Sequence, residues 1–494
     1  MLKKQPLLIR YFLLAGIFFS PIKVWSQLVI SESDYQYKRD FAPYEVSNIV
    51  GLPDQQMIFL LEDGKRRFRL IRYDEYFFEK WSTSIEYKRG GSFPKLLLKE
   101  DKAIIFRFWA HEKEAFAEVR TYSIHSGQLI SEVKETILKS SFELSDIKIK
   151  FSEDLDKFVI YNYWSDDSQQ DLFEVYDSNE LQKRYTYQIN VPETLNKKKT
   201  VYLNSDGELF VAVADEGTFN IDGYFFDPDN SDQPIVLNSS FTFQRPANTI
   251  QQMFVVKQSI STYSVILAAN IDEEMVGMNI TSFNVVLNSV LFSNSYDLDE
   301  EFILETYFDK IITTENQRSR FLEAPEDLSN FYMTEIYLNS EGEMVCMIEN
   351  QEFRSEYHEL SKGMNKPLKW KETEDVYYEC EDIILVNLSS VGEIIWNKVI
   401  HKTQSEKGKG LGLSYFSKMY GDTLRLVTQE EARGDSFYRF DINTSTGELI
   451  NRYSFIDKNL MYNKNYSGWI DERTLVICGY PANTKSRAFY LVEF

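Results

Sequence analysis

Cysteine is scarce in this chain of 494 residues, which has only Cys346, Cys380 and Cys478. An odd number of cysteines leaves at least one thiol outside any intramolecular disulfide. Each lies in an apolar, strand-like pattern, and this pattern predicts buried and inert thiols. A Cys346–Cys380 bridge is the alternative, because we expect these two residues on neighbouring strands. In either case the chain is not a disulfide scaffold.

Motifs for metal binding and catalysis are also missing. The four histidines are far apart in sequence and none has the spacing of paired metal ligands (His111, His125, His358 and His401). We find no HExxH helix, no GxSxG elbow and no phosphate-binding glycine loop. Residues 227–232 have oxygen ligands at alternate positions, but they lack the glycine and the closing glutamate of a calcium loop. We therefore predict no catalytic residues, no metal site and no cofactor.

Basic residues are outnumbered, with 54 Lys and Arg against 76 Asp and Glu, which gives a formal net charge of −22. A surface of this sign repels phosphate backbones and anionic lipid headgroups, so we expect no nucleic-acid partner. Beyond the first 26 residues no run is apolar enough for a bilayer-spanning helix, so we also expect no membrane span. The simplest role of the negative charge is to keep the protein soluble.

Residues 1–26 have the pattern of a cleaved export signal. A basic start is followed by the short apolar run YFLLAGIFFS. The small Ser26 and the tolerable Val24 stand one and three residues before the cleavage, which we place before Gln27. An uncleaved membrane anchor is the alternative, but Pro21 and Lys23 interrupt the apolar run. Cleavage would remove four basic residues and leave 468 residues with a net charge of −26. These features predict a secreted or periplasmic protein.

Aromatic residues make up 15% of the chain, and apolar and polar residues alternate in runs bounded by Gly, Asn, Asp and Ser. Such alternation predicts β-strands, in which aromatic side chains pack well on half-buried surfaces. An aromatic platform for carbohydrate is the alternative explanation. Strand packing accounts for the excess without it.

One stretch of the sequence occurs twice and indicates a repeat. Residues 202–213, YLNSDGELFVAV, match residues 337–348, YLNSEGEMVCMI, at six of twelve positions. Each copy has the pattern strand, tight turn, strand, with Gly207 or Gly342 where a turn needs positive φ. The copies start 135 residues apart, or three units of about 45 residues, the length of a four-stranded propeller blade. Repeated strand units bury their faces against one another, so the pattern predicts a β-propeller.

The chain ends on three strand-like segments without a fourth. Residues 28–37, LVISESDYQY, can supply the missing strand from the other terminus. A ring closed in this way leaves no open sheet edge. We therefore predict an all-β fold: a single propeller over 27–494 with four-stranded blades, closed by the N-terminal strand. Eight blades are favoured and seven is the alternative, because the inner strand of the first blade is weakly marked.

A second turn pattern, in which Gly is followed by Gln or Glu and then by an apolar pair, occurs at Gly127, Gly392 and Gly447, and Trp396 follows one copy. An aspartate or asparagine precedes two of the copies. This pattern resembles the repeat of quinoprotein-type (PQQ-like) propellers. The resemblance implies the propeller fold, whereas the adjacent cysteines associated with the catalytic site of quinoprotein dehydrogenases are missing.

Two insertions, 297–331 and 351–377, interrupt the repeat. In the first, apolar residues from Phe302 to Ile312 recur at helical spacing, and Asp299 is a possible N-cap, so we predict a helix there; a strand pair is the alternative. The second is predicted as a charged loop that carries Tyr357, His358 and Trp370. By strand count both insertions leave the propeller on the same face.

Long loops gathered on one side of a rigid scaffold are common binding sites. We therefore expect an exported, non-catalytic propeller, a monomer that binds a protein or carbohydrate ligand on this face. The candidate contact residues are Phe302, Tyr307, Tyr357, His358 and Trp370. If the helix only covers apolar core, its apolar residues will instead be buried. Two alternative functions remain: a hydrolase or lyase with its site at the channel, and a sensor module for a small ligand.

Overall fold

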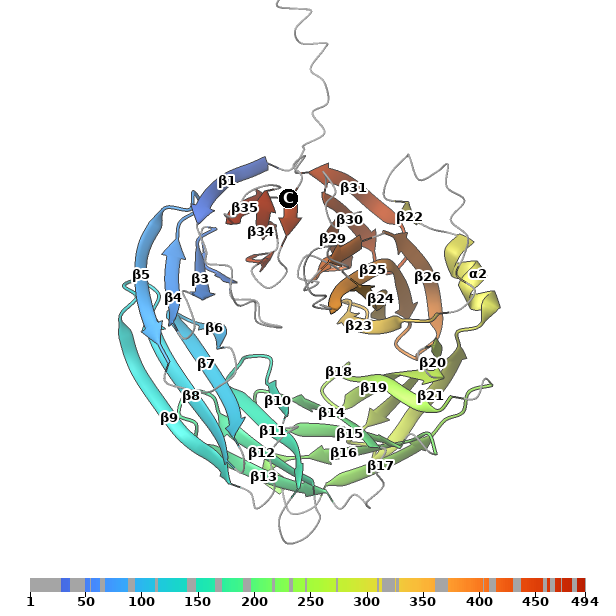
Figure 1. Ribbon diagram of the computed structural model, residues 1–494. Coiled ribbons are helices and arrows are strands. Elements are labelled where there is room, and N and C mark those ends of the chain that lie inside the picture. The colour runs from blue at the N-terminus through green and yellow to red at the C-terminus, as the bar shows by residue number, and fades with distance from the viewer. Residues whose placement is uncertain are drawn as a thin grey trace, which may run out of the picture.

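Eight β-sheets form a closed ring around a central axis in the computed structural model (Figure 1). The structure describes residues 28–35, 49–53, 55–62, 67–87, 94–111, 114–139, 148–164, 171–189, 197–215, 218–230, 234–244, 247–271, 274–308, 311–312, 325, 328–359, 372–402, 404–407, 415–429, 437–455, 460–462, 467–471, 473–481 and 487–493. The predicted export signal, its cleavage site and Trp370 lie outside these residues. No helix in the described part of the chain is long and apolar enough to cross a membrane.

The main strands of each blade, here A to D, pair antiparallel and follow one another from the axis outwards. Blade 1 consists of β2 (Ile49–Gly51), β3 (Met57–Glu62), β4 (Arg67–Tyr73) and β5 (Glu79–Glu86), and blade 2 of β6 (Lys95–Lys99), β7 (Lys102–His111), β8 (Glu114–Ser123) and β9 (Leu129–Lys139). Blade 3 consists of β10 (Lys148–Phe151), β11 (Lys157–Trp164), β12 (Asp171–Asp177) and β13 (Lys183–Ile189). Blade 4 consists of β14 (Lys197–Leu203), β15 (Leu209–Asp215), β16 (Asn220–Phe226) and β17 (Ile235–Ser240), with the short 3-10 helix η1 (Pro228–Asn230) between the last two.

The other four blades complete the ring. Blade 5 consists of β18 (Thr249–Lys257), β19 (Thr262–Ile271), β20 (Glu274–Asn284) and β21 (Ser289–Asp297). Blade 6 consists of β23 (Phe331–Leu338), β24 (Met344–Glu359), β25 (Glu372–Leu388) and β26 (Ile394–His401), extended by β22 (Ile311–Ile312) and β27 (Gln404–Lys407). Blade 7 consists of β28 (Tyr415–Tyr420), β29 (Thr423–Gln429), β30 (Phe437–Asn443) and β31 (Leu449–Phe455). Blade 8 combines β32 (Leu460–Tyr462), β33 (Gly468–Trp469), β34 (Thr474–Pro481) and β35 (Arg487–Glu493) with β1 (Leu28–Tyr35) from the N-terminus.

The ring is closed by strands from both ends of the chain, as the sequence predicted. Strand β1 pairs antiparallel with β35, from Leu28 opposite Glu493 to Tyr35 opposite Arg487. The prediction of eight blades is therefore confirmed. The seven-blade alternative arose because the inner strand of blade 1, β2, has only three residues.

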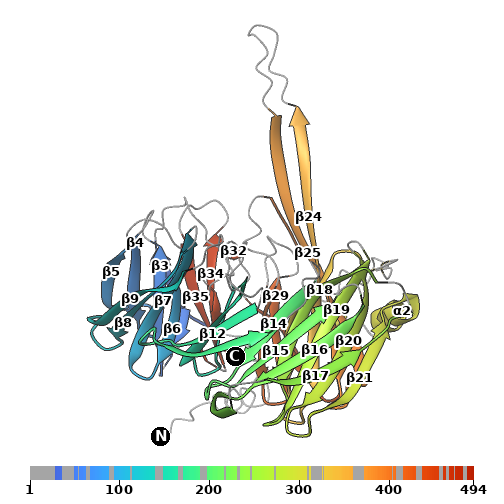
Figure 2. The same ribbon diagram turned by 90° about the horizontal axis from the view of Figure 1, so that it is seen from below.

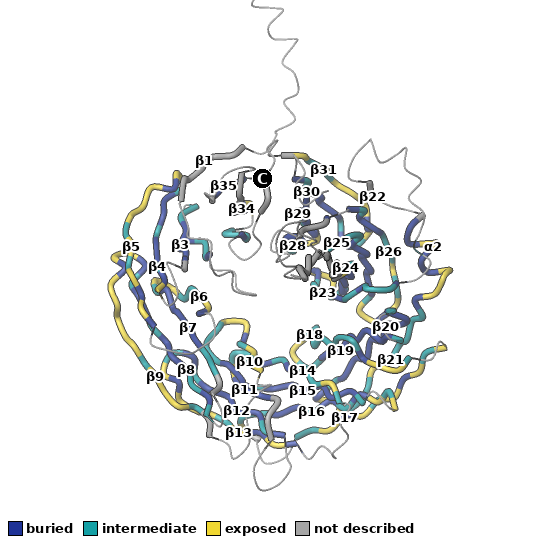
Figure 3. Tube along the Cα trace, viewed as in Figure 1, coloured by how far each residue is buried: buried dark blue, intermediate teal, exposed yellow. Residues whose placement is uncertain are grey.

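Aromatic rings fill the spaces between neighbouring blades. Phe210 of blade 4 stacks on Tyr263 of blade 5, with ring centroids 4.6 Å apart. Across the closure, Phe59 of blade 1 meets Phe489 of blade 8 edge to face at 4.8 Å. Figure 3 shows the buried residues along the middle strands of each blade, with most exposed positions at the turns and on the outer strands. This packing explains much of the aromatic content of the chain.

The duplicated turns adopt the predicted backbone. Gly207 has φ of 97° and Gly342 has φ of 77°. In the first turn Asn204 Oδ1 accepts hydrogen bonds from the N–H groups of Gly207 and Glu208, at 2.9 and 2.8 Å. In the second, Asn339 Oδ1 accepts one from the N–H group of Glu343 at 2.9 Å. Asparagine is repeated here because its side chain satisfies turn N–H groups that the sheet leaves unpaired.

Replacing either turn glycine by alanine is expected to destabilise the protein, but Gly207→Ala should cost more. Both changes force a side chain into a positive-φ conformation, at roughly 1 kcal/mol. A Cβ atom at Gly207 would also lie 2.7 Å from the Tyr185 ring, whereas nothing lies within 4 Å of one at Gly342. Denaturant unfolding of both variants should therefore give about 2–3 kcal/mol for Gly207→Ala. Equal losses would contradict this explanation.

The first insertion contains the predicted helix, α2 (Glu300–Phe308). Asp299 caps it, since its Oδ1 accepts a hydrogen bond from the N–H group of Phe302 at 3.0 Å. The helix ends earlier than the apolar pattern suggested. Ile311 and Ile312 form β22 instead, which pairs parallel with the end of β26 at Ile400 and His401. The insertion therefore runs along the outer edge of blade 6 (Figure 1).

The second insertion differs from the predicted charged loop, because strands β24 and β25 continue into it. They pair from Gln351 opposite Cys380 to Glu359 opposite Glu372, beyond the end of every neighbouring blade (Figure 2). Within 351–359 the even positions Glu352, Arg354, Glu356 and His358 alternate with mostly uncharged residues, which suits an extended ribbon, whereas 372–377 show no such alternation. We call 351–359 and 372–380 the projecting hairpin and the ring face it leaves the hairpin face.

The register of blade 6 also decides the disulfide question. Cys346 lies opposite Val386, and Cys380 lies opposite Gln351 at the start of the projecting hairpin. The two cysteines are on neighbouring strands as expected, but Cys380 lies six positions along β25 from Val386, the partner of Cys346. No bridge forms between them, and all three cysteines are buried. Burial raises the pKa of the Cys346 thiol to about 12, which makes it unreactive.

Candidate functional site

The base of the projecting hairpin is a β-bulge. The pairing of β24 with β25 shifts register between Glu349 and Gln351, so that Glu381 and Asp382 of β25 lie at the irregularity. Bulges redirect side chains that regular alternation would place elsewhere. Strand β26 ends beside this point at His401, and β27 takes over as the neighbour of β25 at Cys380. Polar side chains from four elements therefore meet where the hairpin leaves the ring.

Asp382 holds the two insertions together. Its Oδ2 accepts a hydrogen bond of 2.6 Å from the hydroxyl of Tyr307 on α2. Its Oδ1 lies 2.5 Å from Nδ1 of His401 at the end of β26. Both the aspartate and the histidine are largely buried, with 13% and 14% of their side chains exposed. The first insertion is thus attached directly to the base of the second.

Negative charge accumulates at this base. Burial raises the pKa of Tyr307, and the adjacent Asp382 carboxylate raises it further, so the tyrosine remains a neutral hydrogen-bond donor. Burial also raises the pKa of Glu381, with further increases from Asp382 and Glu379, while His401 lowers it. The base can therefore hold a proton or a cationic group more readily than an isolated surface carboxylate can.

Replacing Glu381 by Gln is expected to stabilise the protein at neutral pH. Because the folded-state pKa of Glu381 is raised, its ionised form is disfavoured in the fold. This cost is complete above the folded pKa and is lost as the pH falls to the unfolded pKa. We expect a gain below about 1 kcal/mol at pH 7 that disappears as the pH falls towards about 4, near the unfolded pKa of glutamate. Melting temperatures of both proteins across this range measure the effect. A gain that is independent of pH would contradict the electrostatic explanation.

A buried ion pair lies directly beneath the bulge. Lys402 Nζ is 2.8 Å from Glu349 Oε1, and neither side chain has any exposed surface. Gln351 donates from Nε2 to the other Glu349 oxygen at 2.7 Å. Gln404 accepts a hydrogen bond from Lys402 and donates one to the carbonyl of Gln429 in blade 7, at 3.1 and 2.8 Å. The hairpin base is thereby anchored to the next blade.

The outer surface of α2 is acidic and contains one exposed apolar residue. Leu304 is 57% exposed. It lines a shallow depression together with Glu300, Glu301 and Glu305. The opposite side of the helix is core: Phe302, Ile303 and Tyr307 are buried in the cluster that also contains Leu298. Among the side chains of α2 that the structure describes, only those on the acidic side are exposed to a partner.

The predicted contact residues are therefore not equivalent. Phe302 and Tyr307 are buried, which is the outcome expected if the helix covers apolar core. Tyr357 and His358 belong to the projecting hairpin, in register with Glu374 and Thr373. The structure brings Tyr307 to the hairpin base, and neither Phe302 nor Tyr307 can belong to an exposed patch because both are buried. Trp370 lies outside the described residues.

Sequence reasoning missed Asp382, Glu349 and Lys402 completely and treated His401 as an isolated histidine. No local spacing connects these four residues, because they meet only through the register of β25 and the turn after β26. The position of Lys402 directly after a strand with apolar residues was only a weak sign that this lysine is buried. Buried lysines need a carboxylate partner, but the sequence offers 76 acids to choose from.

The opposite face of the ring carries exposed apolar residues that were also missed. Ile260 is 90% exposed in the first turn of blade 5, and Val286 and Leu287 are 78% and 66% exposed in its last turn. The two turns are adjacent, since the N–H group of Val285 donates to the carbonyl of Ser261 at 2.9 Å. We call these three residues the turn-face patch. Nothing in the described structure covers it.

Comparisons with known proteins give distant likenesses only. No family model matches the chain, and no curated protein sequence matches it. Among solved structures, it is similar to the quinohemoprotein alcohol dehydrogenase ADHIIG from Pseudomonas putida HK5, with 8% identity and a TM-score of 0.45 over 96% of this chain and 78% of that one. The chain is also similar to a europium-containing methanol dehydrogenase, with 8% identity and a TM-score of 0.43 over 95% of this chain and 93% of that one.

A third match comes from a different kind of protein. The β-propeller domain of Nup133 from Vanderwaltozyma polyspora gives 10% identity and a TM-score of 0.36 over 81% of this chain and 100% of that one. The likeness to quinoprotein dehydrogenases agrees with the resemblance of the glycine turns to their repeats. At such low identities and scores none of these matches carries an argument about activity, and the function must be argued from the residues of this chain.

Proposed function

We propose that the protein is an exported, non-catalytic binding propeller that captures a partner with its hairpin face. The observation that carries this proposal is the projecting hairpin, a paired ribbon that extends beyond the ring from an anchored base. The ring and the Lys402–Glu349 pair fix where the ribbon starts. A rigid support lowers the entropy lost when a partner binds, and so favours a binding role.

The edges of the hairpin suit a partner that adds a strand. Strand β24 pairs with β23 only as far as Asn350, so 351–359 have no described strand on that side. An exposed strand edge offers unpaired N–H and C=O groups to an extended segment of another protein. A folded monomer normally protects such an edge, and the charged residues along 351–359 are one form of protection. We therefore favour a protein partner over a carbohydrate.

Shortening the hairpin should abolish capture without unfolding the ring. Phe353 and Tyr378 are a cross-strand pair, so a two-residue Asn-Gly turn can replace residues 354–377. The variant should keep the melting temperature of the wild type within a few degrees. In a pull-down from culture medium or envelope extract, with partners quantified by mass spectrometry, it should lose partners that the wild type retains.

A matched variant on the other face provides the control. Serine substitution of Ile260, Val286 and Leu287 removes the turn-face patch and leaves the hairpin unchanged, so capture should persist. If the shortened protein captures the same partners as efficiently as the wild type, the hairpin is not the binding element. Loss of capture only in the serine variant would assign binding to the turn-face patch instead.

A further inference from the structure

The described innermost strands of seven blades have the opposite charge to the chain as a whole. Seven of the blades have β2, β6, β10, β14, β18, β23 and β28 as their innermost strands (Figure 1). Within the described residues, these strands contain nine lysines and one carboxylate, Glu335 (the lysines are 95, 99, 148, 150, 197, 198, 199, 257 and 418). The whole chain has a net charge of −22. This excess of lysine on the inner wall therefore needs a specific explanation.

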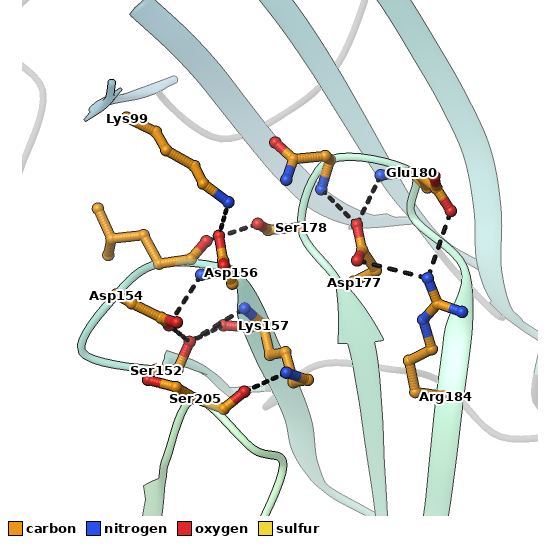
Figure 4. Close-up of polar contacts among 12 residues, drawn as sticks. Lys99, Ser152, Asp154, Asp156, Lys157, Asp177, Ser178, Glu180, Arg184 and Ser205 are labelled. Atoms are coloured by element: carbon orange, nitrogen blue, oxygen red, sulfur yellow. Dashed lines mark hydrogen bonds and ion pairs between the residues drawn. The ribbon is translucent and has the colours of Figure 1, made fainter. Parts of the chain in front are cut away.

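Structural contacts account for part of it. Lys99 of blade 2 pairs with Asp156 in the first turn of blade 3, next to the contact that Lys157 makes with the carbonyl of Ser205 in blade 4 (Figure 4). Lys257 lies 3.5 Å from Glu208. Lys199 pairs with Asp171 and Lys418 donates to the carbonyl of Asp471. Four inner lysines, 99, 199, 257 and 418, therefore link neighbouring strands and blades. A fifth, Lys197, lies near Asp222, where its charge opposes the rise in pKa that burial causes. These five inner lysines carry no further inference.

Four inner lysines have no such role: Lys95, Lys148, Lys150 and Lys198. Each is exposed, and none forms an ion pair with a described residue. They lie on β6, β10 and β14, the inner strands of three consecutive blades. Contact of Lys95 Nζ with the Phe151 ring, at 5.0 Å, shows that the first two of these strands face each other closely. We call these four residues the inner lysine set.

Within the inner lysine set, Lys95 is crowded as well as unpaired. Although Lys95 has exposed surface, burial lowers its pKa, and the Lys150 ammonium lowers it further. On a concave wall, a side chain can be exposed to solvent and still be surrounded by many protein atoms. Like charges on such a wall repel one another, and they concentrate the electrostatic field in the space that they face. An anion in that space would relieve the repulsion.

We propose that the inner lysine set binds a compact multivalent anion that carries phosphate or carboxylate groups. Four ammonium groups on three blades suit several negative charges better than one, because each exposed contact is weak alone. Lysine presents a point charge on a flexible stem, so the site selects charge rather than planar geometry. The acidic exterior disfavours a long nucleic-acid backbone and leaves a small anion that fits inside the ring.

This site is independent of the hairpin face. The hairpin belongs to blade 6, whereas the inner lysine set belongs to blades 2, 3 and 4. If the inner lysine set binds no anion, the proposed capture of a partner by the hairpin is unaffected, and the reverse also holds. Its ligand is a small anion, whereas the hairpin edge suits a polypeptide.

Calorimetric titration with inorganic tripolyphosphate and with citrate, at about 20 mM and about 200 mM salt, tests the proposal. The wild type should bind at least one probe at low salt and bind it more weakly at high salt. Binding of tripolyphosphate alone would indicate a phosphate-bearing ligand, and binding of citrate alone a carboxylate-bearing one. Lys148→Gln combined with Lys150→Gln should reduce the affinity at least about tenfold.

The control must change the net charge equally at a different place. Lys134→Gln combined with Arg452→Gln does so, because both side chains are exposed on the outermost strands β9 and β31. This variant should bind the probe within about twofold of the wild type. Without ligand, the Lys148/Lys150 variant should melt no lower than the wild type at low salt, because repulsion with Lys95 is reduced. The proposal is overturned if the wild type binds neither probe, or if the two double variants lose affinity equally.

Discussion

Deletion of residues 27–38 is expected to lower the melting temperature by about 5 °C or more, because it removes the strand that closes the ring. Seven residues of β1 pair with β35, and each lost backbone contact costs about 1 kcal/mol net. For a chain of this length, a loss of about 5 kcal/mol corresponds to a decrease of several degrees. The deletion also leaves β35 as an exposed edge, so the variant should aggregate at concentrations where the wild type is monomeric. Calorimetry and light scattering measure both effects.

A peptide added in trans provides the control for this deletion. The synthetic segment QLVISESDYQYK, residues 27–38, should pair with the exposed edge of β35 and restore part of the lost melting temperature. A peptide with the same composition in scrambled order should not, because its alternation of apolar and polar residues is lost. A deletion variant as stable as the wild type would show that the paired terminus contributes nothing to closure.

The repeat made the architecture predictable from the sequence. The matching Asn204 and Asn339 turns gave the blade length, and the three-strand C-terminus implied closure by β1. These are local signals, since strand alternation and turn glycines depend on residues a few positions apart. Blade 6 was harder, because the many charges of 351–377 indicated a loop, whereas the pairing of β24 with β25 shows that the strands continue.

The hairpin base was not predictable, for a physical reason. Asp382, His401 and Tyr307 meet because of a one-residue register shift and a helix that ends at Phe308 instead of Ile312. Neither event leaves a pattern in the sequence, since each depends on which strand edges are already occupied. The inner lysine set was concealed differently. Its members look like ordinary surface charges until the sheet order places their strands on the channel.

Replacing Lys402 by Met is expected to cost about 3–5 kcal/mol of folding stability. The substitution leaves the Glu349 carboxylate without its cation at a position with no exposed surface. Gln351 still donates one hydrogen bond to this carboxylate, but an amide does not compensate a buried charge. Denaturant unfolding should show a lower midpoint. The tighter test is a double-mutant cycle with Glu349→Leu.

In that cycle the double variant should be much closer to the wild type than either single variant. Removing both charges avoids the uncompensated ion, and methionine and leucine fill a similar volume with apolar atoms. Gln404 keeps its hydrogen bond to the carbonyl of Gln429, so the link to blade 7 survives in part. A double variant as unstable as the sum of the single variants would contradict the ion pair. If partner capture is retained in the double variant, the pair serves stability alone. If capture falls while stability returns, the Lys402–Glu349 pair also fixes the direction in which the hairpin projects.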